Sequence, residues 1–208
     1  MHFASKKAFF HEFIFEACPE VYQPSEDSFL FAEHLYVDSG ACVLDMGTGS
    51  GILGVIAAEA ASEVVAIDVN PHSVRCAKQN ARQNGVEEKI SFMQGDLYSG
   101  LAETAQFDLI LFNAPYLPSE KGEDDSWLGR AWAGGISGRQ VIDRFILQSA
   151  KHLKRTGKIL LMQSTLSKVA ETLNLFRTLQ MEAKAVASLE LPLFETLVLV
   201  KAQFSASK

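Results

Sequence analysis

A glycine-rich segment in the first half of the chain has the residue types of a small-ligand site. It joins the apolar run 41–46 to the apolar run 51–60, and its candidate contact residues are Asp45, Gly47, Thr48, Gly49 and Gly51. Glycines at alternate positions let the backbone turn tightly and let a ligand come close to it. The start of a helix beyond them favours an anionic group, such as a carboxylate or a phosphate. The segment therefore predicts a strand–loop–helix unit that holds a nucleotide-like ligand.

Two ligands fit this segment, and the neighbouring carboxylates distinguish them. Residues 49–54 satisfy the dinucleotide pattern GxGxxG, and Asp68 is suitably spaced for a ribose contact. Asp45, however, lies at the expected strand end, where it would attract an ammonium and a sulfonium and repel a pyrophosphate. Asp96 follows the run 89–94, so three carboxylates at successive strand ends would line one crevice. These features favour S-adenosyl-L-methionine, and a glycine turn without a ligand is the plainer alternative.

Each carboxylate receives a predicted role in binding this cofactor. Asp45 faces the methionine ammonium, and Asp68 accepts hydrogen bonds from the ribose hydroxyls. Asp96 and Leu97 lie beside the adenine. Val69, which follows Asp68, completes the contacts predicted for this part of the chain.

A second set of residues, Asn113-Ala114-Pro115-Tyr116, follows the apolar run 107–112 and is predicted to be catalytic, with Asn113 also predicted to contact the cofactor. An amide or exocyclic amino nitrogen is a poor nucleophile, because its lone pair is delocalised. The Asn113 side-chain oxygen and the Ala114 carbonyl could each accept one of its N–H groups, and such positioning contributes roughly 7–11 kcal/mol in favourable cases. Tyr116 would stack on the flat group. The tetrapeptide resembles the [ND]PP[YFW] motif of methyltransferases that act on such nitrogens.

The tetrapeptide departs from that motif at Ala114, where the motif has its first proline. The backbone carbonyl is retained, and Pro115 still biases Ala114 toward the extended region. The lost rigidity amounts to roughly 0.4–1 kcal/mol. We expect activity to be retained.

Helices and strands are expected to alternate along most of the chain. Ser25 can cap a helix through Leu35, Asn70-Pro71 opens a helix that Gly85 stops, and Gly157 ends a helix over about 138–154. The remaining expected helices are 51–60 and 165–179, and the expected strands are 41–46, 63–68, 89–94, 107–112, 158–163, 183–190 and 195–202.

This alternation predicts an α/β fold with a doubly wound, mostly parallel, seven-stranded Rossmann-like sheet and a ligand crevice at the strand carboxyl ends. The last strand is continuously apolar over 197–200, which is typical of a strand buried on both faces. We expect it to insert, antiparallel, between 158–163 and 183–190. The polar stretch 119–137 interrupts the pattern.

Composition indicates one folded domain. The chain has 208 residues, of which 48% are apolar and 21% charged, and its net charge of −6 argues against broad binding to nucleic acid. Cys18, Cys42 and Cys76 have no metal-ligand spacing and are expected to be unpaired core residues of a cytoplasmic protein. No apolar run approaches the ~18 residues of a membrane helix. We therefore treat 1–208 as a single domain, with 1–24 as an N-terminal extension and 117–137 as a substrate-rim loop.

Two further blocks narrow the resemblance. Residues 21–30 (VYQPSEDSFL) and 131–145 (AWAGGISGRQVIDRF) are similar to segments of the HemK-type methyltransferases, in their archaeal and eukaryotic release-factor branch. The resemblance places Tyr22 and Ser28 near the cofactor, with Ser28 where the family has threonine. It implies methylation of the glutamine N5 in the Gly-Gly-Gln motif of a class I peptide chain release factor. It also implies a small zinc-binding activator subunit on the edge strand 89–94, although Ile90 and Phe92 could be ordinary core residues.

Other functions fit the same tetrapeptide. The acceptor could be an exocyclic amine of a nucleic-acid base, although no base-reading domain is evident and a base in a duplex must be flipped out. A protein lysine is another candidate acceptor. A non-catalytic cofactor-binding subunit is a third possibility, against which the intact Asn113 and Tyr116 argue.

Overall fold

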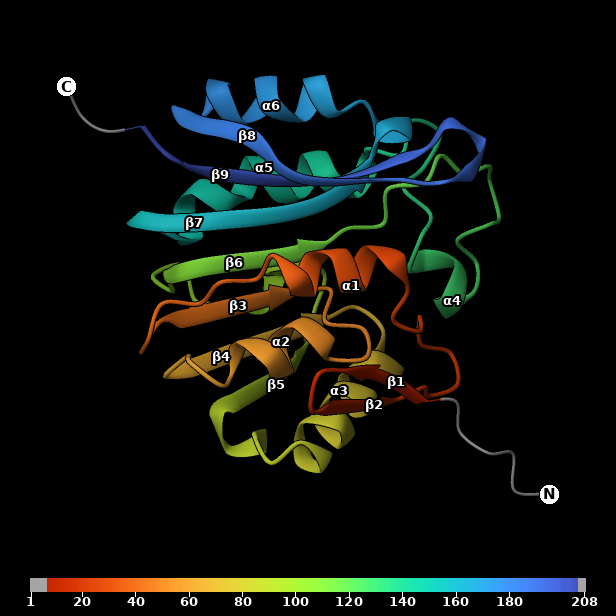
Figure 1. Cartoon of the computed structure of the whole chain (residues 1–208). Coiled ribbons are helices and arrows are strands. Elements are labelled where there is room, and N and C mark those ends of the chain that lie inside the picture. Colours follow the sequence, from red (N-terminus) through yellow and green to blue (C-terminus); the bar gives the residue numbers. More distant parts are fainter. Residues whose placement is uncertain (1–6, 206–208) are drawn as a thin grey trace. The chain divides into compact units, whose positions relative to one another are not determined.

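The computed structural model of the chain describes residues 7–205 (Figure 1). These residues form two compact units, the first ending at Gly100 and the second beginning at Leu101. None of the helices within residues 7–205 is long and apolar enough to span a bilayer.

The first unit contains a short hairpin and three parallel strands. The strand order is β5-β4-β3, with Leu44 opposite Val65 and Val65 opposite Ser91. Its elements are β1 (Lys7–Phe10), β2 (Phe13–Glu16), α1 (Glu26–Glu33), β3 (Cys42–Met46), α2 (Ile52–Ala57), β4 (Glu63–Asp68), α3 (Pro71–Gln83), the 3-10 turn η1 (Glu87–Lys89), β5 (Ile90–Gln94) and the 3-10 turn η2 (Leu97–Gly100).

The second unit contains the other four strands, in the order β6-β7-β9-β8. β6 and β7 are parallel, and β9 runs antiparallel to both β7 and β8. Its elements are β6 (Phe107–Asn113), α4 (Trp127–Arg130), α5 (Gln140–His152), β7 (Leu153–Ser164), the 3-10 turn η3 (Thr165–Ser167), α6 (Val169–Thr178), β8 (Met181–Glu190), the 3-10 turn η4 (Pro192–Phe194) and β9 (Thr196–Phe204). α6 lies along β8 (Figure 1).

These strands confirm the predicted fold class. β3 to β9 make up a mostly parallel seven-stranded sheet, and the last strand is inserted antiparallel as expected. Its residues 197–200 are all buried, in agreement with the apolar run. The predicted bounds of the strands lie within two residues of the observed ones except in β7, which begins at Leu153 instead of 158, and β4 agrees at both ends.

The apolar stripe of α5 explains how the end of β6 is held. Ile142, Phe145 and Ile146 recur at helical spacing and are fully buried. The ring centroid of Phe145 lies 4.6 Å from that of Phe112 in β6. Burial of a side chain of this size stabilises the fold by roughly 1.5–3 kcal/mol. This packing fixes the residue next to Asn113.

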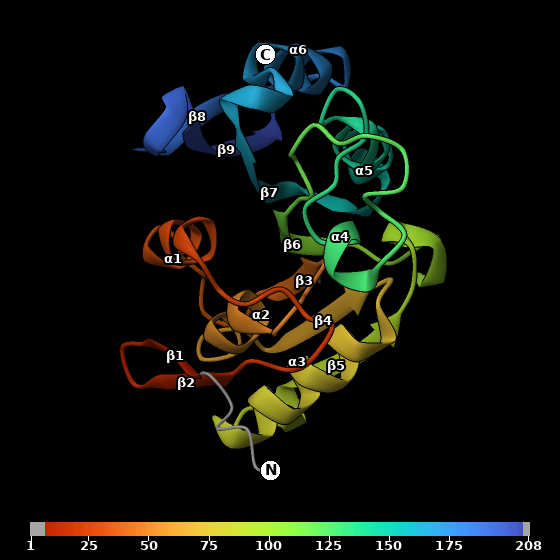
Figure 2. The same cartoon turned by 90° about the vertical axis from the view of Figure 1, so that its right-hand side faces the viewer.

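The N-terminal hairpin β1–β2 was not predicted and lies beside α3 (Figure 2). Asn80 of α3 and Asn84, just after α3, form hydrogen bonds with the β2 backbone of the kind that a neighbouring strand would form. Ile14 N donates to Asn84 Oδ1 at 3.0 Å, and Asn84 Nδ2 donates back to Ile14 O at 2.8 Å. Glu16 N donates to Asn80 Oδ1 at 2.9 Å. The hairpin therefore depends on side chains far away in the sequence.

The prediction for the cysteines is wrong for two of them. Cys18, just after β2, and Cys76 of α3 form a disulfide, with their Cα atoms 6.0 Å apart. Cys42 takes no part in this disulfide and is half-buried. The sequence pattern could not reveal this pairing, because the fold brings together residues separated by 58 positions. The expectation of a reducing compartment therefore loses the support that unpaired cysteines gave it.

One local prediction in the second unit is also wrong. α5 ends at His152, and Gly157 lies inside β7 instead of ending the helix. Leu153 pairs with Phe107, and a Cβ at Gly157 would lie 2.9 Å from the Phe107 carbonyl oxygen, so the glycine permits close passage of the two strands. The stretch 119–137 contains α4, which begins where Ser126 Oγ accepts a hydrogen bond from Gly129 N at 2.9 Å.

Candidate active site

Asp45 lies near the carboxyl end of β3 and is held by the loop that follows it. Its Oδ2 accepts hydrogen bonds from Thr48 Oγ1 at 2.6 Å and from Gly54 N at 3.0 Å. A Cβ at Gly54 would lie 2.8 Å from the same oxygen, so this approach requires glycine. The loop glycines with left-handed backbone are Gly47 (φ 64°), Gly49 (φ 56°) and Gly51 (φ 88°). The loop therefore closes around a carboxylate that is only 1% exposed.

The loop is also held against α3. A Cβ at Gly51 would lie 2.9 Å from Ala77 Cα, so the glycine lets the loop contact the helix backbone. Asn80 Nδ2 donates to Ser50 O at 2.8 Å. Sequence reasoning missed Asn80, since a buried polar residue in a helix is recognised only once its partner is known.

Asp68 ends β4 and bonds to the same loop. Its Oδ2 accepts from Gly49 N at 2.9 Å, and its Oδ1 accepts from Asn70 N at 2.8 Å. Ser73 also hydrogen-bonds to this carboxylate. A carboxylate offers about four acceptor positions, so capacity for a further donor remains. Burial raises the pKa of Asp68, and these hydrogen bonds oppose the rise.

Burial raises the pKa of Asp45 to about 7, with a smaller contribution from the nearby Asp68 charge. The hydrogen bonds from Thr48 and Gly54 act in the opposite direction. Between about pH 4 and pH 7 the folded protein therefore holds a proton that the unfolded chain has released. By linkage, this group makes the fold less stable as the pH rises through that window. A cation placed beside Asp45 would offset the cost of its charge.

Tyr22 and Ser28 gather around Asp27. Ser28 N and Oγ both donate to Asp27 Oδ1, at 2.6 and 3.1 Å. Burial, followed by the Asp27 charge, raises the pKa of Tyr22 to about 12, so its hydroxyl stays protonated. Asp27 is 5% exposed and was not predicted as a site residue; the available signals were its place in the family-like block 21–30 and in the first turn of α1.

The predicted adenine contacts follow the ends of β4 and β5. Gly95 N donates to Asp68 O at 3.0 Å, which brings the turn after β5 next to the end of β4. Asp96 is exposed, Leu97 is buried with a left-handed φ of 50°, and Val69 is 40% exposed. The first unit thus brings the three carboxylate-bearing strand ends to one edge of its sheet. The cofactor contacts assigned to these residues remain predictions.

The tetrapeptide 113–116, which is predicted to hold the acceptor, lies at the carboxyl end of β6 in the second unit. Asn113 ends β6 and pairs with Met162 of β7. Ala114 is 2% exposed, whereas Asn113, Pro115 and Tyr116 are half-buried. The Ala114 position therefore has little room for a larger side chain.

The residues after the tetrapeptide pair with the block 132–135. Leu117 N donates to Trp132 O at 3.0 Å, and Gly134 N donates to Leu117 O at 2.8 Å. Ser119 N donates to Gly135 O at 3.0 Å. Part of the expected rim loop is therefore ordered by backbone hydrogen bonds and shapes the segment that leaves the acceptor motif.

The structure groups the predicted residues into three sets, each within one unit. The first set surrounds Asp45 and Asp68, the second surrounds Asp27, and the third is the tetrapeptide with its pairing block. Within residues 7–205 no group of three His, Cys, Asp or Glu side chains could hold a metal ion.

Comparison with known proteins places the chain in a family. The family described as "Methyltransferase small domain" matches residues 23–128. A putative protein N5-glutamine methyltransferase of Methanocaldococcus jannaschii, MJ0928, is 40% identical over 88% of this chain and 92% of its own length. The human "Methyltransferase HEMK2" is 34% identical over 62% of this chain and 64% of its own length.

Solved structures show the same fold. The Mtq2–Trm112 complex of E. cuniculi, described as responsible for methylation of the eRF1 translation termination factor, matches with a TM-score of 0.67 at 22% identity, over 89% of this chain and 99% of the matched chain. The M. jannaschii tRNA m1G37 methyltransferase matches with a TM-score of 0.73 at 16% identity, over 100% and 59%. The family match and the sequence relatives show that the chain belongs to the methyltransferase small-domain family and is a methyltransferase.

Proposed function

We propose that the chain transfers a methyl group from S-adenosyl-L-methionine to the side-chain amide nitrogen of a glutamine, in the Gly-Gly-Gln motif of a class I peptide chain release factor. The tetrapeptide at the end of β6 carries the proposal. A primary amide has two N–H groups, and the Asn113 side-chain oxygen and the Ala114 carbonyl supply two acceptors for them. The M. jannaschii relative, named as an N5-glutamine methyltransferase, supports the same acceptor.

The residues of the first unit fit the proposed cofactor. Asp45 is buried with a raised pKa, so an ammonium beside it would stabilise its charged form. The left-handed glycines have no side chain that would keep a ligand away from the loop backbone. Asp68 retains capacity to accept a hydrogen bond from a ribose hydroxyl. S-adenosyl-L-methionine supplies an electrophilic methyl group on a sulfonium. Tyr22, Ser28, Val69, Asp96 and Leu97 complete the proposed contacts.

The acceptor residues act by orientation. Asn113 and Ala114 hold the amide N–H groups so that the nitrogen lone pair points toward the methyl donor, and Tyr116 fixes the plane of the amide. The nitrogen–carbon bond forms as the sulfur–carbon bond breaks, and the nitrogen then releases a proton. The amide nitrogen becomes acidic after transfer, so no strong base is required.

Surface features of the second unit favour a protein acceptor over a nucleic acid. The basic residues Lys151, Lys154, Arg155 and Lys158 cluster near the start of β7. Two of these cations are engaged within the unit: Lys154 pairs with Asp108 at 2.8 Å, and Arg155 lies over the Phe204 ring at 4.5 Å. Leu193 and Phe194, in the turn between β8 and β9, are 93% and 102% exposed. That turn lies near the carboxyl end of β7, because Ser164, the last residue of β7, pairs with Leu197 near the start of β9.

An activator subunit is also proposed, on β5. This strand lies at the end of the strand order, with Ile90 buried, Ser91 exposed and Phe92 half-buried. The backbone groups of an edge strand can pair with another chain. The similar Mtq2 structure is a complex with Trm112. We propose a small zinc-binding subunit at this edge, and a cytoplasmic location with the release factor.

The test uses labelled S-adenosyl-L-methionine, the activator and the cognate release factor. Label on the Gly-Gly-Gln glutamine, located by mass spectrometry, is the expected result. A release factor with that glutamine replaced by alanine is the matched control and should remain unlabelled. Label on a lysine, or on RNA or DNA offered in the same assay, would overturn the proposed acceptor.

A further inference from the structure

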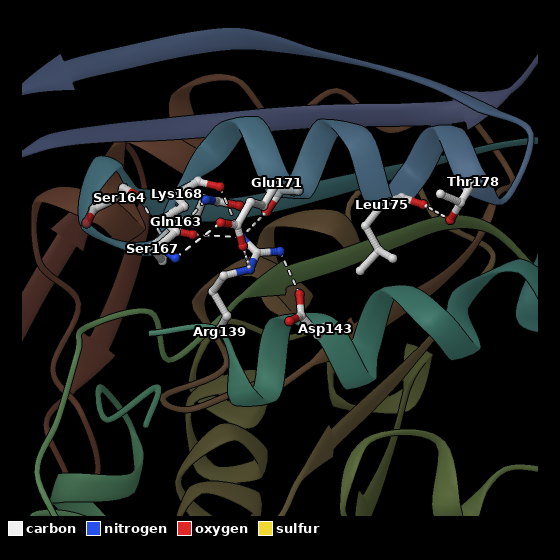
Figure 3. Close-up of polar contacts among 10 residues, drawn as sticks. Arg139, Asp143, Gln163, Ser164, Ser167, Lys168, Glu171, Leu175 and Thr178 are labelled. Carbon is white, nitrogen blue, oxygen red and sulfur yellow. Dashed lines mark hydrogen bonds and ion pairs between the residues drawn. The ribbon is translucent and has the colours of Figure 1, made fainter. Parts of the chain in front are cut away.

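Arg139 is a buried cation at the start of α5, in the second unit. Its side chain is 4% exposed and reaches toward the turn that precedes α6 (Figure 3). All three guanidinium nitrogens are engaged. Nη1 donates to Ser167 O at 2.7 Å, Lys168 O at 3.1 Å and Thr172 Oγ1 at 2.9 Å, Nη2 donates to Asp143 Oδ1 at 2.6 Å, and Nε lies 3.3 Å from Glu171 Oε2.

The environment of this guanidinium explains why arginine is needed. The carbonyls of Ser167 and Lys168 belong to a turn that ends with a left-handed residue, Lys168 (φ 58°), before α6 begins. The planar guanidinium satisfies both carbonyls while it pairs with two carboxylates that are about half exposed. A lysine ammonium at this position could not reach all of these partners at once. Arg139 therefore fixes the start of α5 against the turn η3 and the first part of α6.

The residue before Arg139 contacts the acceptor segment. Gly138 has a left-handed φ of 69°, and a Cβ there would overlap the carbonyl oxygen of Tyr116 and lie 3.1 Å from Ser167 Cβ. Gly138 is thus enclosed between the last residue of the tetrapeptide and the turn that Arg139 holds. Gly138 N also donates to Gly135 O at 2.9 Å, which connects it to the block paired with Leu117.

We infer that Arg139 is a positioning residue for the acceptor tetrapeptide, an inference that rests on the proposed function. By holding Gly138 between Tyr116 and Ser167, it fixes the backbone that leaves the tetrapeptide and so sets the direction of the Ala114 carbonyl and the Tyr116 ring. Arg139 itself touches neither the acceptor nor the methyl donor. Its loss should impair turnover, whereas cofactor binding by the first unit should be unchanged.

The experiment compares Arg139→Lys with Arg177→Lys. Arg177 is an exposed arginine of α6 that bonds to Asn174, so its replacement controls for the loss of a guanidinium. For Arg139→Lys we expect kcat for the release factor to fall at least tenfold, with the Kd for S-adenosyl-L-methionine within twofold of the wild-type value. The control variant should match the wild type in both.

Amide hydrogen exchange gives a readout that does not depend on the reaction. In Arg139→Lys the Leu117 and Gly134 amides should exchange at least tenfold faster, whereas the Gly49 amide, which bonds to Asp68 in the first unit, should exchange at the wild-type rate. Thr172→Val removes one acceptor of the guanidinium and should shift the same amides by a smaller factor. If Arg139→Lys does not fold, Thr172→Val is used in its place.

The outcomes separate the two proposals. A wild-type protein that methylates no release factor overturns the proposed function, and the exchange rates still decide whether Arg139 orders the segment. A folded Arg139→Lys protein with wild-type exchange at Leu117 and Gly134 overturns the positioning role. A wild-type kcat in Arg139→Lys also overturns the positioning role.

Discussion

The two segments that carry the candidate chemistry are held in different ways. The glycine loop is held by side chains of its own unit, since Asp45 bonds to Thr48 and Gly54, Asp68 bonds to Gly49, and Asn80 bonds to Ser50. The segment after the tetrapeptide is held by backbone hydrogen bonds to the block 132–135. Through Gly138 and Arg139 it is also held by the turn at Ser167. The proposed donor half, which is the glycine loop with its partners in the first unit, is therefore held by side chains. The proposed acceptor half, which is the tetrapeptide with the block 132–135, is held by backbone pairing within the second unit. Substitutions there can therefore alter it and leave the donor half intact.

The largest expected effect separates the two halves directly. Asn113→Ala should lower turnover by roughly 10³-fold, about 4 kcal/mol, because the acceptor amide loses one of two orienting hydrogen bonds. Cofactor affinity should stay within about twofold, since the other predicted cofactor contacts lie in the first unit. Single-turnover kinetics and calorimetry measure the two quantities. If both fall together, Asn113 does not have the role assigned to it.

The next effect is confined to the first unit. Reduction of the Cys18–Cys76 disulfide, or Cys76→Ser, should lower the free energy of unfolding by about 2–4 kcal/mol, because the bond closes a long loop. Denaturant titration with and without reductant measures the loss. Cys42→Ser is the control and should behave as the wild type does under both conditions. An unchanged midpoint on reduction would show that the hairpin is held by Asn80 and Asn84 alone.

A matched pair of glycines tests the acceptor half. Gly138→Ala introduces a left-handed alanine whose Cβ meets Tyr116 O, and Gly85→Ala introduces one in open space. The left-handed backbone costs roughly 1–2 kcal/mol in each, and overlap should add about 1 kcal/mol or more in Gly138→Ala. Thermal unfolding measures stability, and only Gly138→Ala should also lower kcat. Equal losses in both variants would mean that Gly138 and Tyr116 are not tightly packed.

The smallest effect concerns the donor half and its pH dependence. The pKa of Asp45 is about 7 in the free protein, and an ammonium beside it would lower that pKa. Affinity for S-adenosyl-L-methionine should therefore fall by about tenfold from pH 8 to pH 6, because the carboxyl group must lose a proton on binding. Asp45→Asn should bind more weakly at pH 8 and show little change over this range. Calorimetry at several pH values decides, and a flat wild-type profile would remove Asp45 as the ammonium partner.

The sequence predicted most of the sheet and the grouping of residues around the glycine loop, because these depend on local patterns. Alternating apolar runs identified β3 to β6 and the inserted β9, and the glycine spacing identified a loop around Asp45. The hairpin β1–β2 was missed, since its anchors are Asn80 and Asn84, 64 and 70 residues away. Gly157 was mistaken for a helix stop, because the strand that passes beside it is distant in the sequence.

The site residues that the sequence missed are polar side chains whose partners only the fold reveals. Asp27 was only one letter of the family-like block 21–30, yet it is buried beside Tyr22 and Ser28. Arg139 appeared only as part of a family-like block. Nothing in either residue's neighbours along the chain shows that it is buried, so burial of such groups requires the three-dimensional structure.

The inserted position of β9 has a consequence for how the second unit is made. β7 and β8 flank β9 and are joined by its hydrogen bonds on both sides. During synthesis both flanking strands leave the ribosome before the strand that links them. This half of the protein must therefore wait for its last-made strand before its sheet is continuous, and until then two long backbone edges stay open to wrong partners.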